Sequence, residues 1–427
     1  MKFNHKNSLI TNQQLKKISI KKELNNLKEA SKLKYENDRA SINLPLDKIL
    51  LKNINKIIKE KKKLNPSYLI VIGIGGSNLG TIAVQESVLG KNYNSLTKKT
   101  KILYLDTVDS DSLNSIIKII QPELKKGKNI IVNAVSKSGG TTETIANFEI
   151  ILNLLKKHKK NYKDLVVVTT DKNSNFWNYA VNNSFTSLEI PKKVGGRYSV
   201  FSPVGLFPLG MLNINLNRLL DGAKSARNSG LSTNKNLPAL SAIIQFLNYK
   251  KGKNISDLFL FSNDLESIGK WYRQLMGESI GKEFNNQNKK IFNGITPSVS
   301  IGSTDLHSMA QLYLGGPYDK FTTILRLENS IKLKVPKLNY ELVNNIETKS
   351  LHEIMGAIID GIEIAFRKGK RPFVEITLKD KSEYSIGYFL QFKMIEMMYL
   401  GYLMNVNPFD QPSVESYKIE TKKILDK

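Results

Sequence analysis

The stretch Asn129-Ile130-Ile131-Val132-Asn133-Ala134-Val135, followed by Ser136-Lys137-Ser138-Gly139-Gly140-Thr141-Thr142-Glu143-Thr144, is an apolar strand that runs through a short turn into a helix. The helix is expected to begin at about Thr142. Helix N-termini carry unpaired N–H donors and a partial positive charge, so they bind phosphate monoesters well. The same residues also fit an ordinary N-cap with Glu143 in the first turn. Both interpretations are open from this stretch alone.

A second strand ends in a similar glycine turn. The apolar run Tyr68–Ile74 is followed by Gly75-Gly76-Ser77-Asn78-Leu79-Gly80, which opens another helix. Glycine lets the backbone approach a ligand closely, and Ser77 adds a hydroxyl group. The glycine spacing is not that of a dinucleotide site, although Asp106 could be placed to bind a ribose. Two junctions of this kind favour a sugar phosphate over a nucleotide.

Strand-like runs alternate with helix-like segments along the chain, which predicts repeated βαβ units. The predicted strands are 68–74, 101–105, 130–135, 165–170, 257–261, 322–327 and 373–378, and the predicted helices are about 78–89, 111–120, 142–156, 237–248, 268–276, 352–368 and 386–405. We therefore predict an α/β protein with two doubly wound domains, whose parallel sheets are flanked by helices. The predicted boundaries are an N-terminal helical extension over 1–50, domains over 51–190 and 191–385, and a C-terminal helix and tail over 386–427.

Composition narrows the function classes. The chain has 427 residues, long enough for two domains, and no cysteine, which excludes disulfides, thiol catalysis and thiolate metal sites. Its 64 Lys and Arg against 38 Asp and Glu give a net charge of +26. The lysines are spread along the whole chain and no nucleic-acid-binding motif is recognisable, so we predict no nucleic-acid partner. A basic surface could still attract an anionic substrate.

Targeting signals are not recognisable in the sequence. The first thirty residues lack an apolar core of the signal-peptide type. The apolar run Tyr388–Met404 is interrupted by Lys393 and Glu396, and no run reaches the roughly 18 residues that a membrane span needs. We expect a soluble, cytoplasmic protein without a membrane partner.

Two segments offer groups for acid–base chemistry. In Gly195-Gly196-Arg197-Tyr198-Ser199 the glycines would let the Arg197 guanidinium lean over a bound anion, or the arginine could form an interdomain salt bridge. Glu278 follows Gln274 by four residues and has glycines on both sides, which suggests a helix end with the carboxylate facing a cavity. A solvated glutamate is the plainer alternative.

Two further segments are ambiguous by themselves. His307, in Thr304-Asp305-Leu306-His307-Ser308, is one of four histidines, and most single histidines are structural. The segment Asn407–Lys418 contains a proline-rich turn that could return Gln411 and Lys418 to the body of the protein, or it could be a tail.

Taken in order, these segments resemble the phosphoglucose isomerase family, in its shorter bacterial form. The resemblance runs from about Val71 to Lys418 through Gly73–Ser77, Ser136–Thr142, Gly195–Ser199, Glu278–Lys282, the block around His307, and Asn407–Lys418. It implies two SIS-type sugar-isomerase domains. It also implies reversible conversion of glucose 6-phosphate to fructose 6-phosphate through a cis-enediolate, in glycolysis and gluconeogenesis. Ile280 stands where the family usually has Asn, which bears on fine specificity.

The resemblance also assigns roles to individual residues. The phosphate-binding residues it implies are Ser136, Lys137, Ser138 and Thr141, with Gly76 and Ser77 beside them. The substrate-positioning residues are Gly196, Gln274 and Gln411. Neither a metal nor a cofactor is implied.

The implied catalytic groups are Glu278, Arg197, His307 and Lys418. Glu278 resembles the base that moves a proton between C1 and C2, and Arg197 the cation that stabilises the enediolate. His307 and Lys418 resemble the pair that opens the sugar ring. Family members are dimers in which the histidine reaches the neighbouring site, so a homodimer with shared active sites is expected.

The chemistry of such a reaction agrees with this set. Removing a proton next to a carbonyl needs a base, and the developing oxyanion needs a cation or hydrogen-bond donors. A sensor of the SIS type that binds sugar phosphates without turnover would keep the Ser136–Thr142 loop but would not need Glu278, His307 and Lys418 together. An isomerase that also accepts mannose 6-phosphate stays open.

Overall fold

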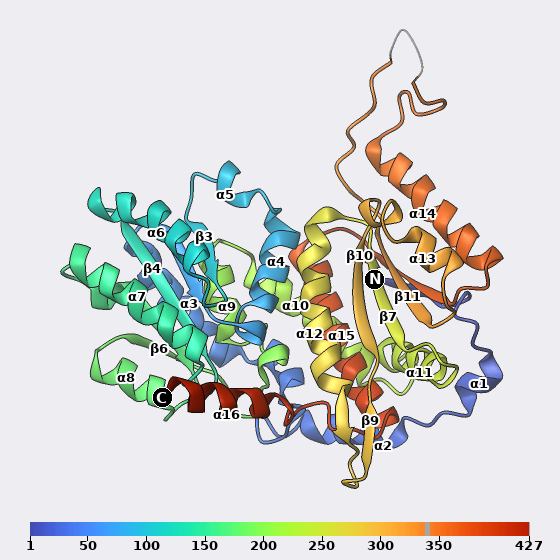
Figure 1. Cartoon of the computed structure of the whole chain (residues 1–427), viewed down its shortest axis with the longest axis horizontal. Helices are drawn as coiled ribbons and strands as arrows, with labels where there is room; N and C mark the ends of the chain where they lie inside the picture. Colours follow the sequence, from blue (N-terminus) through green and yellow to red (C-terminus); the bar gives the residue numbers. More distant parts are fainter. Residues whose placement is uncertain (338–341, 427) are drawn as a thin grey trace.

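The computed structural model describes residues 1–337 and 342–426, and within them two parallel sheets lie side by side, each with its own helices (Figure 1). The predicted domain over 191–385 includes the four undescribed residues 338–341, and the predicted tail ends in Lys427, which also lies outside the described residues.

The first sheet has the strand order β3-β2-β4-β5-β6, and all its strand pairs are parallel. Its strands are β2 (Pro66–Ile72), β3 (Lys101–Leu105), β4 (Asn129–Ser136), β5 (Val166–Thr170) and β6 (Thr186–Glu189). The helices of this half are α3 (Lys48–Lys63), α4 (Leu79–Leu89), α5 (Tyr93–Leu96), α6 (Ser110–Lys125), α7 (Thr142–His158) and α8 (Asn175–Asn182). The central strands β2, β4 and β5 are almost continuously apolar and buried, as strands covered on both faces must be.

The second sheet has the order β1-β12-β11-β7-β10. Its strands are β1 (Lys2–Asn4), β7 (Ile255–Leu260), β10 (Thr296–Ile301), β11 (Lys320–Leu327) and β12 (Phe373–Leu378). All its pairs are parallel except the one between β1 and β12. The helices of this half are α11 (Leu237–Lys250), α12 (Glu266–Ile280), α13 (Ala310–Gly315) and α14 (Leu351–Lys368), and a small hairpin joins β8 (Lys282–Phe284) to β9 (Lys290–Asn293).

Helix α15 (Glu383–Leu403) packs along α10 (Leu216–Gly230) and also contacts α11 and α12. Gly387 of α15 lies so close to α10 that a Cβ added there would be 2.0 Å from the Leu219 carbonyl oxygen. Because α15 is buried almost all round, its sequence is mostly apolar, and the buried Lys393 and Glu396 form an ion pair at 2.8 Å. The remaining helices are α1 (Asn12–Lys16), α2 (Lys21–Ala30), α9 (Pro203–Met211) and α16 (Val414–Leu425).

The predicted fold class is confirmed: the protein is α/β, with two parallel sheets flanked by helices. The sequence did not predict β1, β6, β8, β9 or β10. Strand β1 has only three residues, too few for a pattern, and it contributes an antiparallel edge to the second sheet. Strand β10 contains a proline and two serines, so it lacks the apolar run by which the other strands were predicted. It is an edge strand, and its serines donate hydrogen bonds to a buried carboxylate.

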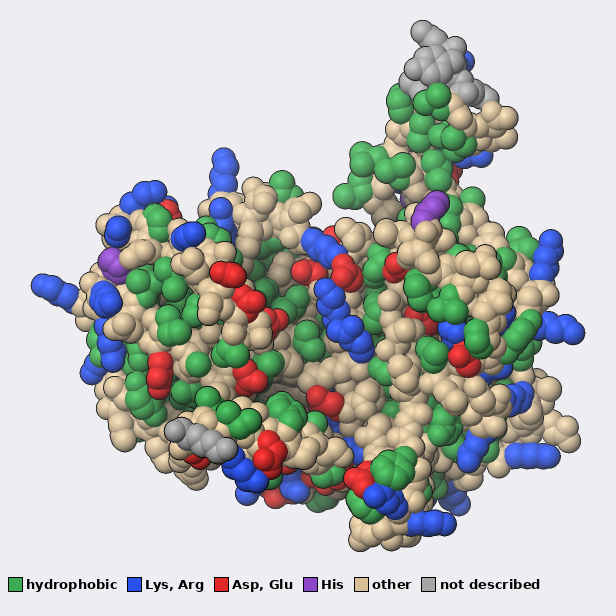
Figure 2. Space-filling view, viewed as in Figure 1, with side chains coloured by type: hydrophobic (Ala, Val, Ile, Leu, Met, Phe, Trp, Pro, Cys, Tyr) green, Lys and Arg blue, Asp and Glu red, His purple; other side chains and the backbone are tan. Residues whose placement is uncertain are grey.

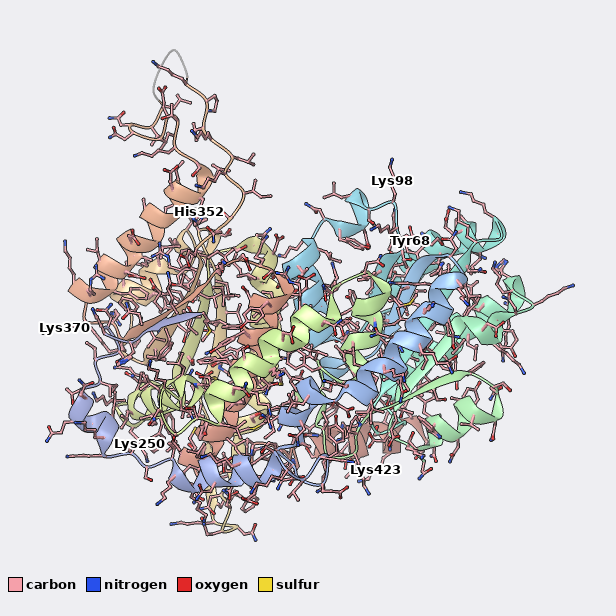
Figure 3. The ribbon with its side chains drawn as sticks, turned by 180° about the vertical axis from the view of Figure 1, so that it is seen from behind. Tyr68, Lys98, Lys250, His352, Lys370 and Lys423 are labelled. Carbon is pink, nitrogen blue, oxygen red and sulfur yellow. The ribbon has the colours of Figure 1, made fainter. Side chains whose placement is uncertain are left out.

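Basic and acidic side chains are interspersed over the face shown in Figure 2, and several basic side chains lie in the middle of this face. Seen from behind, Lys98 projects away from the body (Figure 3), and Lys250, Lys370 and Lys423 are also exposed. The described residues 328–337 and 342–350, between β11 and α14, extend beyond the rest of the molecule (Figures 1 and 2). Among the described residues, no helix combines the length and apolar character needed to cross a membrane.

Candidate active site

The two glycine-rich turns of the first sheet lie next to each other. They follow β2 and β4, which are neighbouring parallel strands, so both turns are at the carboxyl edge of the sheet. A Cβ added at Gly73 would lie 3.0 Å from the Val135 carbonyl oxygen and 2.8 Å from the Ser77 side chain. This edge is where open α/β sheets usually bind ligands.

The loop after β4 does not cap the following helix with a side chain. Thr141 is the N-cap residue of α7, but its side chain makes no capping hydrogen bond. Its hydroxyl instead bonds with the Ser136 hydroxyl at 2.9 Å. The first N–H groups of α7 are therefore left without a side-chain cap at Thr141, which favours a bound anion at this end of the helix. Ser138, on the exposed part of the loop, accepts a bond from the Gly140 N–H at 3.4 Å.

The charge in this loop comes from Lys137. Its side chain is half-buried, and burial lowers the pKa of its ammonium group, while the nearby Asp171 carboxylate acts in the opposite direction.

Thr144, one turn into α7, is buried, and its hydroxyl has no hydrogen-bond partner in the described chain. The sequence analysis did not single out Thr144, although its position three residues after Thr141 puts it on the same helix face.

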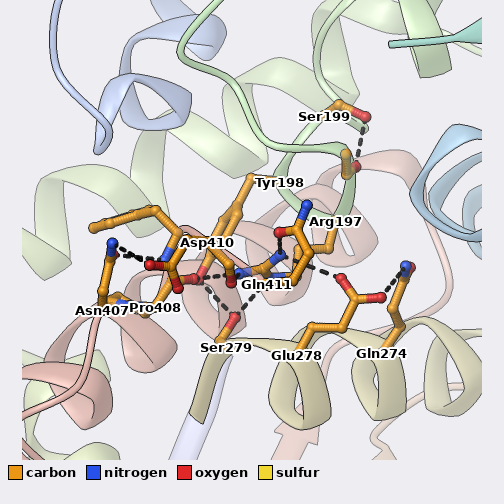
Figure 4. Close-up of polar contacts among 12 residues, drawn as sticks. Arg197, Tyr198, Ser199, Gln274, Glu278, Ser279, Asn407, Pro408, Asp410 and Gln411 are labelled. Atoms are coloured by element: carbon orange, nitrogen blue, oxygen red, sulfur yellow. Dashed lines mark hydrogen bonds and ion pairs between the residues drawn. The ribbon is translucent and has the colours of Figure 1, made fainter. Parts of the chain in front are cut away.

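Arg197 is the centre of the second cluster, and its side chain is only 2% exposed. Its Nε donates to Ser279 Oγ at 2.9 Å, and its Nη2 donates to the carbonyl oxygens of Pro408 at 2.6 Å and Asp410 at 3.0 Å (Figure 4). Its Nη1 donates to Gln411 Oε1 at 2.8 Å. The guanidinium group thus joins the turn after β6, helix α12 and the C-terminal segment.

Two glycines let the first half of the chain approach this cluster. A Cβ at Gly76 would lie 2.2 Å from the Gly196 carbonyl carbon, so the two backbones are in direct contact. Gly75 has φ of +58°, and its Cα faces the Gln274 amide, which a Cβ would approach to 2.8 Å. The short turn Gly196–Tyr198 is also bonded to Gly76 through the Ser199 hydroxyl. These close approaches explain why glycine stands at 75 and 76.

Glu278 lies near the end of α12 with its carboxylate between two donors. Arg197 Nη1 donates to Glu278 Oε2 at 3.2 Å, and Gln274 Nε2 donates to Glu278 Oε1 at 3.0 Å (Figure 4). The Glu278 side chain is 32% exposed, whereas Arg197 is buried. A carboxylate that is held by two donors and is open to one side is placed to exchange a proton with a bound ligand.

Lys282 and Asp410 form a clamp that the sequence analysis missed. Lys282 Nζ donates to the Glu278 carbonyl oxygen at 2.9 Å, to Asp410 Oδ1 at 2.9 Å and to the Asp410 carbonyl oxygen. The clamp ties the end of α12 to the segment that carries Gln411. Lys282 lies in the segment Glu278–Lys282, and Asp410 lies in the segment Asn407–Lys418. Membership of these two segments was the only feature of the sequence that pointed to either residue.

His307 and Lys418 make no hydrogen bond or ion pair with this cluster within the described chain. His307 is exposed at the end of the turn Thr304–Leu306, and neighbouring Asp305 fixes that turn by accepting from the Ile301 N–H at 2.7 Å. Lys418 lies on α16, and its Nζ donates to Glu415 Oε1 at 2.8 Å. Neither side chain bonds to Glu278 or Arg197 in the described residues.

Ser77 is half-buried beside Gly76 at the start of α4. The described residues contain no group of three or more His, Asp or Glu side chains that could hold a metal ion.

Solved structures with the same fold are known. A hypothetical protein from Thermus thermophilus has a TM-score of 0.86 at 27% identity, with 99% of both chains covered. A glucose-6-phosphate isomerase from Chlamydia trachomatis has a TM-score of 0.78 at 21% identity, covering 92% of this chain and 75% of the other. This chain therefore shares its overall fold with both of these structures.

Sequence comparison gives the family. A profile of the family described as phosphoglucose isomerase matches residues 60–324. A protein named glucose-6-phosphate isomerase from Carboxydothermus hydrogenoformans is 32% identical over 379 residues, which is 86% of this chain and 80% of that protein. The chain belongs to the phosphoglucose isomerase family.

Proposed function

We propose that the protein catalyses the reversible isomerisation of glucose 6-phosphate and fructose 6-phosphate through a cis-enediolate. The observation that carries the proposal is the pair formed by Glu278 and Arg197, a partly open carboxylate held 3.2 Å from a buried guanidinium. This pair supplies the base and the positive charge that an aldose–ketose isomerase needs. Family membership supplies the substrate.

The phosphate group of the substrate is bound by the loop Ser136–Thr141. Lys137 contributes charge, Ser136, Ser138 and Thr141 contribute hydroxyls, and the start of α7 contributes N–H donors. Gly76 and Ser77 line the adjacent turn. Binding energy from this remote group orients the reacting carbons at the other end of the sugar.

Proton transfer takes place at Glu278. Its carboxylate removes the proton from C2 of the open-chain aldose and returns it to C1, and the reverse reaction uses the same path. Negative charge then develops on the two oxygens of the enediolate, next to the Arg197 guanidinium. A buried cation fixed by several hydrogen bonds stabilises that charge without reorganising. Gln274 and Gln411 bind the sugar hydroxyls and so hold the substrate in position. Gly196, which directly precedes Arg197, belongs to the same set of substrate-positioning residues.

Ring opening is assigned to His307 and Lys418, and we propose that the sites are shared within a homodimer. Two features support this proposal. His307 is exposed in its own chain, and among the described residues it makes no hydrogen bond to Glu278, whose side-chain partners are Arg197 and Gln274. The segment between β11 and α14 exposes the apolar side chains of Ile331, Leu333, Leu342 and Val343, and Leu351 at the start of α14 is also exposed; a second copy would cover them.

A coupled assay of the purified chain with fructose 6-phosphate, in the presence of EDTA, tests the proposed function. We expect formation of glucose 6-phosphate at a rate that EDTA does not change. Binding of fructose 6-phosphate without turnover would instead indicate a sugar-phosphate sensor. Mannose 6-phosphate as a second substrate determines how narrow the specificity is.

A further inference from the structure

The phosphate loop rests on the turn that joins β5 to α8, residues 170–174. The Thr170 hydroxyl lies 2.5 Å from the Ser136 carbonyl oxygen, and the Asp171 N–H donates to the Lys137 carbonyl oxygen at 3.3 Å. Gly139, with φ of +71°, faces Ser174, whose Oγ would be 2.7 Å from a Cβ at that position. Two carbonyl groups and one glycine of the loop are therefore fixed by a turn that takes no part in the chemistry.

The hydroxyls of this turn form a chain whose direction is determined. The Trp177 N–H can only donate, and it donates to Ser174 Oγ at 3.1 Å. The Ser136 carbonyl can only accept, so the Thr170 proton must point toward it. Ser174 must then donate to Thr170 Oγ1 across their 2.9 Å contact. The chain runs from the start of α8 to the loop, and each bond polarises the next.

This chain has a consequence for anion binding. The Ser136 carbonyl oxygen accepts from Thr170 and also from the Gly139 N–H at 3.2 Å, so both of its lone pairs are used. The Lys137 carbonyl oxygen is likewise directed at the turn. Carbonyl oxygens repel an anion, so holding both toward β5 leaves N–H and hydroxyl donors to meet the phosphate group.

We propose that Thr170 is a positioning residue for the phosphate group: through its hydroxyl it keeps the loop Ser136–Thr141 in the conformation that binds the anion. The inference rests on the proposed function for the identity of the substrate. Thr170 is fully buried and touches no reacting atom, so it acts on phosphate affinity and leaves the proton-transfer step alone.

The neighbouring residue Thr169 provides a matched control. It is also fully buried on β5, but its hydroxyl accepts from Asn133 Nδ2 at 2.9 Å and has no bond to the loop. Thr170→Val and Thr169→Val each remove one buried hydroxyl from adjacent positions of one strand. A general loss of stability would affect both variants.

The experiment measures KM and kcat for fructose 6-phosphate, and the competitive inhibition constant of inorganic phosphate. For Thr170→Val we expect KM and the inhibition constant to rise together by about tenfold, because a loss of affinity of this size corresponds to roughly one lost hydrogen bond. The value of kcat should stay within about twofold of the unmodified protein. Thr170→Ser, which keeps the hydroxyl, should restore all three values, and Thr169→Val should leave KM unchanged.

The proposal is wrong if Thr170→Val leaves KM unchanged, if Thr169→Val raises it equally, or if kcat alone falls. If Thr170→Val does not fold, Ser174→Ala breaks the same chain one bond earlier and should raise KM in the same way. Calorimetric titration with inorganic phosphate separates the two claims. If the protein shows no turnover but its phosphate affinity still depends on Thr170, the proposed function is wrong and the role of Thr170 in anion binding is supported.

Discussion

At the scale of single residues, the pH dependence of the proposed phosphate loop is predicted from Lys137. Burial lowers the pKa of its ammonium group, and the charged groups that face it are Asp171, Asp38, Lys193 and Arg197. Phosphate affinity that depends on this ammonium is complete at low pH and is lost as pH rises through the lowered pKa. The loss therefore begins at a lower pH than for an ordinary lysine.

We predict that KM for fructose 6-phosphate rises at alkaline pH and that Lys137→Arg removes this rise. Arginine keeps its proton throughout the range, although it fits the loop less well and raises KM by a constant factor. KM between pH 6 and pH 10 for both proteins gives the comparison. Parallel curves would show that Lys137 does not contribute the charge that binds phosphate.

Single residues also mark where sequence reasoning stops. Arg197 and Glu278 were predicted because short motifs contain them, and they lie together in the structure. Asp410 and Thr170 were not singled out, because their importance comes from contacts with residues distant in sequence. Asp410 binds Lys282 across 128 positions, and Thr170 binds Ser136 across 34. A local pattern holds no trace of such contacts.

Among the elements, β7 carries an unusual group in the second sheet. Asp257 is almost completely buried, and its Oδ1 accepts from Ser298 at 2.7 Å, Ser300 at 3.0 Å and Tyr313 at 3.4 Å. Burial raises the pKa of this carboxyl group to about 6, against the pull of these hydrogen bonds. The nearby Asp305 carboxylate raises it further. In the folded state the group therefore holds its proton to a higher pH than in the unfolded chain.

We predict that this carboxyl group makes the protein less stable as pH rises from about 4 to 7. The folded state binds more protons than the unfolded state in that window, so ionisation costs stability there, by up to about 3 kcal/mol. Asp257→Asn keeps an oxygen that accepts from the serines and cannot ionise. The free energy of unfolding, measured with urea at several pH values, should fall more steeply with rising pH for the unmodified protein than for the variant. A constant difference between the two curves would contradict the assignment.

The prediction of elements succeeded where periodicity was strong. Strands β2, β4 and β5 are continuous apolar runs, and α7 follows its turn as expected from Thr142. Strand β10 was missed because its serines make it polar. These serines donate hydrogen bonds to Asp257 on strand β7, and the sequence of β10 alone does not reveal that contact. Strand β1 was missed because its only partner is more than 370 residues away in the sequence.

At the scale of the whole molecule, the shared-site proposal makes a complementation prediction. Glu278→Gln and His307→Ala should each be nearly inactive as homodimers. Mixing the two after dissociation and reassociation should restore activity, because one site of the mixed dimer combines an intact Glu278 with an intact His307. Native mass spectrometry establishes whether mixed dimers form. Mixed dimers as inactive as their parents would mean that the histidine acts within its own chain.

The central claim is that Glu278 moves the proton, and deuterium incorporation tests it most directly. Glucose 6-phosphate formed from fructose 6-phosphate in D₂O is analysed by NMR for deuterium at C2. We predict that Glu278→Gln lowers both isomerisation and incorporation by at least about 10²-fold, since the amide keeps the shape but cannot act as a base. Inorganic phosphate should bind the variant as it binds the unmodified protein. Incorporation by the variant at the unmodified rate would contradict the account.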